Sequence, residues 1–353
     1  MSVDSKKVFV GLSGGVDSSV SAALLKRAGH DVTGVFIKVW SPDWLPCTWK
    51  DERRDAMRVA AALDISFLTF DFSAEYKKGV ADYMIEEYKA GRTPNPDVMC
   101  NKEIKFGCFL KKALAMGADF IATGHYAQVT AKTELAEGAD KSKDQSYFLW
   151  TLGRQELAHT LFPVGHLQKS AVRKLAERFR LPTAAKKDSQ GICFIGDVDM
   201  KEFLAHYIET KRGDVLDELG KKIGTHDGAV LYTLGARHGF AISEKTPAGK
   251  PLYVVVKDLE KNTITVSART DSNNFLQSTH AVVLKNTNFI NGTPDENKTY
   301  GARIRYRQEK QLCKIKNATV SFTSAQTGVA VGQSLVVYDG EICLGGGVID
   351  TVL

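Results

Sequence analysis

The fold of this chain is decided by the stretch Ser13-Gly14-Gly15-Val16-Asp17-Ser18-Ser19. It follows the apolar run Val8-Phe9-Val10-Gly11-Leu12, which predicts a strand, and leads into residues 17–26, whose apolar spacing predicts a helix. Glycines between a strand and a helix N-terminus let backbone N–H groups turn toward an anion, and serine hydroxyls add donors. We interpret the stretch as a phosphate-binding loop rather than a plain turn in which Asp17 or Ser18 caps the helix.

The sequence around this loop alternates strand and helix patterns. Strands are expected at residues 32–39, 67–70 and 120–123, and helices at residues 51–63 and 104–116. This alternation predicts an α/β fold with a doubly wound parallel sheet, in which ligands bind at the carboxyl ends of the strands. We expect this catalytic domain to span residues 1–207.

The second half of the chain has a different pattern. Glycine-rich turns separate short apolar runs in residues 208–273, which predicts a small linking domain with little helix. Period-2 segments follow, and they predict a small C-terminal β-barrel over residues 274–353; they are residues 281–284, 302–307, 313–315, 319–322 and 334–338. Residues 134–144 have the composition of a polar, low-complexity loop.

Composition places the chain among globular proteins. It has 353 residues, 43% apolar and 25% charged, and a net charge of +6 that permits an anionic partner without requiring one. No apolar run approaches the roughly 18 residues of a membrane span, and the first residues are not typical of a signal peptide, so we expect a cytoplasmic protein without a membrane partner. The six cysteines include no C-x-x-C pair, which argues against a disulfide framework or zinc site, and no resident metal is expected.

The phosphate loop resembles that of a known superfamily. It lacks the Walker lysine, and the chain has no G-x-G-x-x-G, so terminal-phosphate hydrolysis and dinucleotide binding are disfavoured. The loop is instead similar to the pyrophosphate-binding loop of the N-type ATP pyrophosphatases. That resemblance implies cleavage of ATP, with Mg²⁺, between the α and β phosphates and adenylation of a substrate oxygen. It leaves the substrate open.

Two cysteines lie in loops bounded by glycine or proline. Cys100 ends the run Gly91-Arg92-Thr93-Pro94-Asn95-Pro96-Asp97-Val98-Met99-Cys100, and a helix expected from about Lys102 would favour its thiolate together with Lys105. Cys193 lies in the segment Gly191-Ile192-Cys193-Phe194-Ile195-Gly196. A single intracellular cysteine is usually a small buried hydrophobe. Two in such loops, beside an ATP-activating motif, favour thiol chemistry.

Across its whole length the chain resembles the tRNA-specific 2-thiouridylases. The matching segments are residues 11–18, 90–106, 122–126, 143–149, 161–165, 191–196 and 340–347. The resemblance implies a tRNA-uridine 2-sulfurtransferase, which adenylates C2 of the wobble uridine in tRNA and then replaces the oxygen with persulfide sulfur. The implied partners are tRNA and a persulfide donor, either a sulfur-relay protein or a cysteine desulfurase.

The resemblance also implies roles for individual residues. Cys193 would carry the persulfide, Cys100 would resolve it through a transient Cys100–Cys193 disulfide, and Asp97 would be a general acid/base. The nucleotide-binding set would be Gly11, Leu12, Ser13, Gly14, Gly15, Val16, Asp17, Ser18, Ile37 and Gly124. The tRNA-contacting set would be Asn95, Pro96, Asp97, His125, Lys143, Asp144, Gln145, Arg305, Tyr306 and Gln333. His125 fits equally well as a core histidine whose hydrogen bonds are satisfied.

Basic residues gather in two places. Arg303, Arg305 and Arg307 alternate with Ile304 and Tyr306, and in a strand this spacing would put three guanidinium groups on one face, suited to phosphates. A solvated barrel face is the simpler interpretation. Residues 169–187 form the second basic segment.

Several alternatives stay open. Another enzyme of the superfamily, a ligase or sulfurtransferase acting on a different RNA or a small molecule, would share the phosphate loop, but a ligase would not need Cys100 or Cys193. A non-catalytic RNA-binding or sulfur-carrier protein would not need the loop. Cys47, which follows an unusual tryptophan-rich segment, and Cys108 leave room for an iron–sulfur cluster in place of persulfide chemistry.

Overall fold

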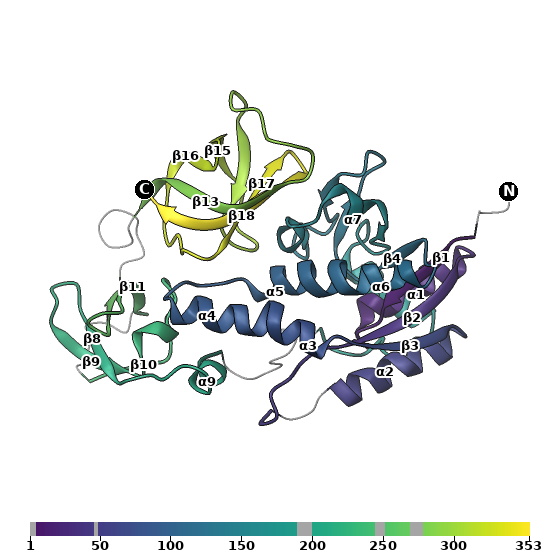
Figure 1. Cartoon of the computed structure of the whole chain (residues 1–353), viewed down its shortest axis with the longest axis horizontal. Coiled ribbons are helices and arrows are strands. Elements are labelled where there is room, and N and C mark those ends of the chain that lie inside the picture. The colour runs from purple at the N-terminus through teal and green to yellow at the C-terminus, as the bar shows by residue number, and fades with distance from the viewer. Residues whose placement is uncertain (1–4, 46–48, 189–199, 244–250, 269–277) are drawn as a thin grey trace.

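Three sheets organise the part of the chain that the computed structural model describes, residues 5–45, 49–188, 200–243, 251–268 and 278–353 (Figure 1). A parallel sheet with helices lies at one end, a small antiparallel-rich sheet at the other, and a barrel packs above the helices that join them. In this part of the chain no helix is long and apolar enough to span a membrane.

The N-terminal sheet is parallel and has the order β3-β2-β1-β4-β7. Its strands are β1 (Lys7–Gly11), β2 (Asp31–Lys38), β3 (Ser66–Asp71), β4 (Phe120–Ala122) and β7 (Thr160–Leu161). The helices α1 (Val16–Arg27) and α2 (Trp49–Ala62) cross over from β1 and β2. The strand order reverses between β1 and β4, and such a switch leaves a crevice at the carboxyl ends of the strands. The predicted doubly wound fold is confirmed.

Two long helical segments lie beside this sheet. The first consists of α3 (Ser73–Tyr76), a π-helical turn (Lys77–Asp82) and α4 (Tyr83–Lys89). The second consists of α5 (Pro96–Met99), a π-helical stretch (Cys100–Phe109) and α6 (Leu110–Ala115). The second begins at Pro96, ahead of the start predicted at residues 102–104, because Asn95 caps it. The side chain of Asn95 accepts a 3.3 Å hydrogen bond from the N–H of Val98, and Pro96 occupies the first helical position.

The connection that follows β4 reaches the barrel. Strands β5 (Ala127–Val129) and β6 (Leu135–Glu137) form a hairpin, and β6 pairs with the barrel strand β18 (Ile342–Val352). The expected polar loop at residues 134–144 was therefore wrong at residues 135–137, which form β6, whereas residues 138–144 do form a loop. Leu135 is fully buried, and the buried charge of Glu137 is paired with Arg303, Lys310 and Lys141, so polar composition hid a core element. Helices α7 (Arg154–Ala158) and α8 (Lys169–Arg178) complete this region, with a 3-10 turn at Ser146–Leu149.

The middle sheet has the order β10-β9-β8-β12-β11. Its strands are β8 (Gly213–Leu216), β9 (Lys222–His226), β10 (Phe240–Ile242), β11 (Tyr253–Asp258) and β12 (Thr263–Ser267), preceded by α9 (Met200–Ala205). A 3-10 turn, Ala229–Leu231, follows β9.

The C-terminal strands close into a six-stranded barrel through the pairing of β13 with β18. The remaining members are β13 (Thr279–Phe289), β14 (Tyr300–Arg303), β15 (Gln311–Lys316), β16 (Thr319–Gln326) and β17 (Ser334–Asp339). The predicted barrel is confirmed, but the strand expected at residues 302–307 ends at Arg303. Arg307 has a φ of 63°, which no strand accommodates, so the three arginines do not share one strand face.

Candidate active site

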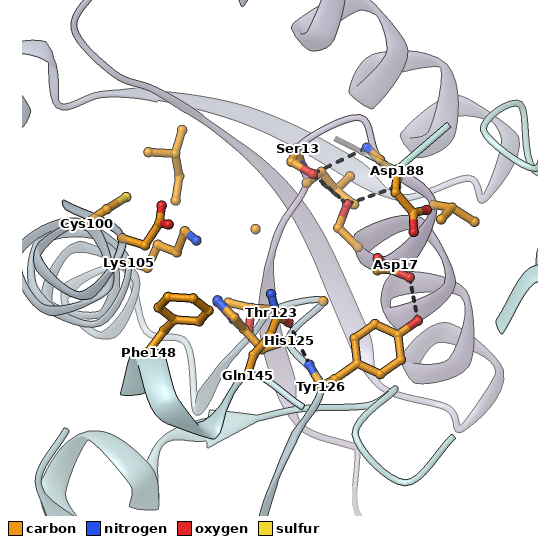
Figure 2. A pocket seen from close by; sticks show the side chains of 18 of the residues that line it. Ser13, Asp17, Cys100, Lys105, Thr123, His125, Tyr126, Gln145, Phe148 and Asp188 are labelled. Carbon is orange, nitrogen blue, oxygen red and sulfur yellow. Dashed lines mark hydrogen bonds between the residues drawn. The ribbon is translucent and has the colours of Figure 1, made fainter. Parts of the chain in front are cut away.

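A cavity of about 560 Å³ lies at the carboxyl ends of β1 and β2, and Figure 2 shows it from close by. The phosphate loop forms one side, the helix that carries Cys100 forms the other, and Tyr306 and Arg307 of the barrel complete the wall. The cavity brings together these residues predicted from the sequence: Gly11, Leu12, Ser13, Gly15, Val16, Asp17, Ser18, Ile37, Asp97, Cys100, Gly124, His125, Lys143, Gln145 and Tyr306.

The phosphate loop is a tight turn held by its own hydroxyl groups. Ser18 Oγ and Ser19 Oγ donate to the carbonyl of Gly15 at 3.1 and 2.7 Å, and Ser13 Oγ lies 3.3 Å from Ser18 Oγ. The first-turn N–H groups of α1 have no partner within the helix, and groups of this kind can donate hydrogen bonds to a bound anion. Gly14 does not line the cavity; its φ of 74° shapes the turn.

An ion cluster lies beside this loop. Lys169 Nζ lies 2.7 Å from Asp17 Oδ1 and 2.9 Å from Asp188 Oδ1, and Lys143 Nζ lies 2.9 Å from Asp188 Oδ2. The Tyr126 hydroxyl also donates to Asp17 Oδ1 at 2.7 Å. Burial works to raise the pKa of Asp188, but hydrogen bonds from Lys143 and Lys169 outweigh it and lower the pKa to about 2. The carboxylate that precedes the Cys193 segment is thus ionised at neutral pH.

The thiol side of the cavity is more enclosed. Cys100 is 3% exposed and lies in the second turn of its helix, so it does not precede the helix as predicted. Figure 2 shows Cys100, Lys105 and Phe148 on one side of the cavity, across from Ser13 and Asp17. Burial raises the pKa of Asp97, and the charge of Lys105 offsets part of that rise. A carboxyl group of this kind is suited to proton transfer.

His125 is a hydrogen-bonded core histidine that also lines the cavity. Its side chain is buried, its Nδ1 lies 2.7 Å from Thr123 Oγ1, and its ring packs near Phe106 and Phe162. Burial, with the positive charge of Lys105, holds the pKa of His125 well below 6.5. It is therefore a neutral, hydrogen-bonded core histidine that also lines the cavity.

The side chains of residues 143–145 point in two directions. Lys143 and Gln145 line the cavity, and Gln145 Oε1 accepts a 3.0 Å hydrogen bond from the N–H of Tyr126. Asp144 is 3% exposed and points away, where it pairs with Arg303 at 2.8 Å. Its carboxylate anchors the segment to the barrel.

Three other residues predicted to contact tRNA, Asn95, Pro96 and Gln333, do not line this cavity. Asn95 caps its helix, Pro96 is buried, and Gln333 Nε2 donates to the carbonyls of Thr93 and Pro94 at 3.0 and 3.1 Å. These contacts hold the loop that precedes Cys100 against the barrel. Tyr306 packs on Phe148 with ring centroids 4.5 Å apart.

Some predictions fall outside the described residues. Cys193, its disulfide with Cys100, and Cys47 belong there. Cys108 is described, and burial raises the pKa of its thiol. Within the described ranges no group of three or more His, Cys, Asp or Glu side chains could hold a metal ion.

Comparison with known proteins covers almost the entire chain. Three family models match in succession: the tRNA methyl transferase HUP domain at residues 6–197, the tRNA methyl transferase PRC-barrel domain at residues 201–268, and the aminomethyltransferase beta-barrel domain at residues 279–349. The tRNA-specific 2-thiouridylase MnmA of Nitrosomonas europaea is 45% identical over 98% of this chain and 99% of its own length. The chain belongs to the tRNA-specific 2-thiouridylase family. MnmA of Francisella tularensis subsp. holarctica is also 45% identical, over 98% and 100% of the two chains.

Solved structures show weaker likenesses to this family member. U34-tRNA thiolase NcsA from Methanococcus maripaludis, with its [4Fe-4S] cluster, is 19% identical, with a TM-score of 0.38 over 55% of this chain and 63% of that chain. NMN synthetase from Francisella tularensis is 18% identical, with a TM-score of 0.33 over 53% and 67%.

In this 2-thiouridylase-family chain, sequence reasoning missed several cavity residues. Lys169 lay within a predicted basic segment, but nothing local indicated that it reaches Asp17, 152 residues away. Tyr126 ends one recognised segment and Asp188 precedes another, and their proximity to the loop depends on the crossovers of the sheet. Thr123 and Phe148 also line the cavity, together with Lys105 and Arg307, which the sequence analysis had named for other reasons.

Proposed function

We propose that this chain converts the wobble uridine of tRNA to 2-thiouridine, using ATP and persulfide sulfur. The observation that carries the proposal is the single cavity that joins the phosphate loop to Cys100 and Asp97. A ligase without sulfur chemistry would not need Cys100 there, and a sulfur carrier would not need the loop. The 45% identity to proteins named tRNA-specific 2-thiouridylase supports the same function.

The loop residues 13–18 would bind the pyrophosphate part of ATP through backbone N–H groups and serine hydroxyls. Ile37 and Gly124 would contact the nucleoside. A Cβ at Gly124 would lie 2.7 Å from the backbone nitrogen of Ser18, so only glycine lets β4 approach the loop this closely. Mg²⁺ is usually bound by one or two carboxylates together with substrate phosphates, and the cavity wall offers Asp17 and Asp188 for this. Bound there, it would neutralise phosphate charge.

Adenylation solves a leaving-group problem. The C2 oxygen of uridine leaves poorly, so it attacks the α phosphorus of ATP and pyrophosphate departs. The terminal sulfur of a persulfide on Cys193 then attacks C2, the C2–O bond breaks, and AMP leaves. Cys100 attacks the inner sulfur of Cys193, which releases the thiolated base and leaves a Cys100–Cys193 disulfide for a reductant to reopen.

Asp97 would accept and return the proton of the uracil ring during these steps, because its buried carboxyl exchanges protons nearer neutral pH than an exposed one. The target base must leave its stack to reach the cavity, where Phe148 and Tyr306 offer aromatic surfaces. The sulfur donor would be a relay protein or a cysteine desulfurase, and the setting would be the cytoplasm.

Nucleoside analysis tests the proposal directly. The protein is incubated with tRNA, ATP, Mg²⁺ and a sulfide source, and the tRNA is digested. We expect 2-thiouridine to form only when ATP is present. A folded protein that binds tRNA and ATP but forms no 2-thiouridine would contradict the proposal and would favour another enzyme of the superfamily.

A further inference from the structure

A second cavity opens beside the candidate active site. It has a volume of about 460 Å³ and shares Tyr306 and Arg307 with the first cavity. Its other walls come from the β14–β15 loop, the start of β15 and the end of β16: Arg305, Gln308, Gln311, Ala325, Gln326 and Thr327. Among the described residues, no carboxylate lines it.

Hydrogen bonds fix the three glutamine side chains of this cavity. Gln308 Oε1 accepts from the N–H of Ile304 at 2.9 Å, and Gln308 Nε2 donates to Gln326 Oε1 at 3.3 Å. Gln326 is only 4% exposed, and Gln311 Nε2 donates to the carbonyl of Glu309 at 3.1 Å. A side-chain amide nitrogen carries two N–H groups, and these bonds use one on Gln308 and one on Gln311. Each of these two side chains therefore keeps one N–H group that can donate to a ligand in the cavity.

Two arginines add positive charge. Both Arg305 and Arg307 are exposed. Arg305 Nη2 donates to the carbonyls of Thr327 and Gly328 at 2.7 and 3.1 Å, which fixes the guanidinium at the cavity wall. The guanidinium of Arg307 lies 4.9 Å from the centre of the Tyr306 ring, between the two cavities. Guanidinium groups and amide N–H groups together suit a ligand rich in hydrogen-bond acceptors.

We propose that the second cavity binds a nucleotide adjacent to the thiolated uridine in the anticodon loop. Its phosphate lies against Arg305 and Arg307, and its base presents carbonyl oxygens to the amides of Gln308 and Gln311. The inference rests on the proposed function, because it places the target base in the first cavity. The shared wall of Tyr306 and Arg307 then puts the neighbouring nucleotide at the second cavity.

Gln311 is the residue to change, because Gln308 also supports the backbone of its loop. The variants are Gln311→Ala, which removes the amide, and Gln311→Glu, which keeps its size but replaces a donor with an acceptor. Gln155→Ala is the matched control, since Gln155 is exposed on α7 and lines neither cavity. Equal thermal unfolding of the four full-length proteins shows that folding is intact.

The measurement is the binding of anticodon stem-loop RNAs by fluorescence anisotropy at fixed salt. One RNA is intact, and two carry an abasic nucleotide on either side of the target uridine. For the intact RNA, Gln311→Ala should weaken binding about tenfold, the effect of one good hydrogen bond, and Gln311→Glu should weaken it more. With one of the two abasic RNAs, wild type and Gln311→Ala should bind equally, because the partner of the amide is gone.

Two results would overturn the inference: binding of the intact RNA by Gln311→Ala that equals that of Gln155→Ala, or a Gln311→Ala deficit that persists with both abasic RNAs. Assaying 2-thiouridine with the wild-type protein keeps the two proposals separate. If the effect of Gln311→Ala disappears with one abasic RNA but no 2-thiouridine forms, the proposed function is rejected and the second cavity remains an RNA-binding site. If 2-thiouridine forms but the effect of Gln311→Ala does not depend on the neighbouring base, only the assignment of the second cavity is rejected.

Discussion

A single backbone position sets the shape of the phosphate loop. Gly14 has a φ of 74°, and a Cβ there would lie 2.6 Å from the carbonyl oxygen of Glu52. Gly29 has a comparable φ of 90°, but an added Cβ would meet nothing within 4 Å. Alanine at either position would strain a left-handed backbone, but only alanine at Gly14 would also clash with a neighbour and displace the loop. Comparing the two substitutions therefore distinguishes the two effects.

We expect Gly14→Ala to reduce pyrophosphate release from ATP at least tenfold while tRNA binding stays intact. Gly29→Ala should lower the free energy of unfolding by about 1 kcal/mol, the cost of a left-handed alanine, and leave pyrophosphate release unchanged. The measurements are a pyrophosphate-release assay and chemical denaturation. Equal release by the two variants would mean that the loop does not bind the nucleotide.

The pKa of Asp97 should make the rate of the reaction depend on pH. Burial raises this pKa, and Asp97 accepts a proton only when ionised, so the single-turnover rate should fall as the pH decreases through the raised pKa. His125 stays neutral over the same range because burial and Lys105 lower its pKa. Rates measured between about pH 5 and pH 8 should show an acid limb in wild type. An identical limb in the residual activity of Asp97→Asn would contradict this role.

At the scale of elements, regular patterns were predictable and interrupted ones were not. The parallel strands and the barrel strands follow uniform apolar runs or period-2 alternation. The helical segment from Ser73 to Lys89 was missed because the π-helical turn Lys77–Asp82 shifts the apolar spacing within it. Strand β6 was missed because Glu137 is buried among charges supplied by the distant barrel.

Substitutions of Arg303 and Arg307 should have different effects, although the alternating sequence pattern predicted the same role for both. Arg303 is 12% exposed at the side chain and pairs with both Glu137 and Asp144, whereas Arg307 is exposed beside both cavities. Arg303→Met should lower the free energy of unfolding by about 3 kcal/mol, because it leaves buried carboxylates unpaired. Arg307→Met should instead reduce the dependence of log tRNA affinity on log salt by about one.

Titration of tRNA binding against salt, together with denaturation, distinguishes these roles. Suppose that Arg303→Met lowers the dependence of log tRNA affinity on log salt and leaves the free energy of unfolding unchanged. Arg303 would then bind a tRNA phosphate, and its ion pairs with Glu137 and Asp144 would not stabilise the fold.

At the scale of the whole molecule, the barrel completes a site that begins in the parallel sheet. It contributes Tyr306 to the cavity, and Gln333 holds the loop that precedes Cys100. Sequence motifs predicted many of the residues that line the cavity, since loop and thiol motifs are local. They could not indicate that Asp144 anchors the barrel rather than facing substrate, because that depends on packing between distant segments.

Serine variants of the two cysteines should fail at different stages of sulfur transfer. Cys193→Ser should take up no labelled sulfur from a cysteine desulfurase, whereas Cys100→Ser should become persulfidated and then stall, because resolution follows sulfur transfer. Both variants should still release pyrophosphate slowly, since adenylation needs no sulfur. Labelled sulfur on Cys100 in the Cys193→Ser protein, located by peptide mass spectrometry, would reverse the two roles.

The central claim is that ATP activates the C2 oxygen of the target uridine and that sulfur then displaces it as part of AMP. The most direct measurement uses a tRNA whose target uridine carries a heavy-oxygen label at C2, followed by mass spectrometry of the AMP released in one turnover. The account predicts that AMP acquires the heavy oxygen in the same amount as 2-thiouridine forms. Unlabelled AMP accompanying 2-thiouridine would contradict it, because the C2 oxygen would then have left without being adenylated.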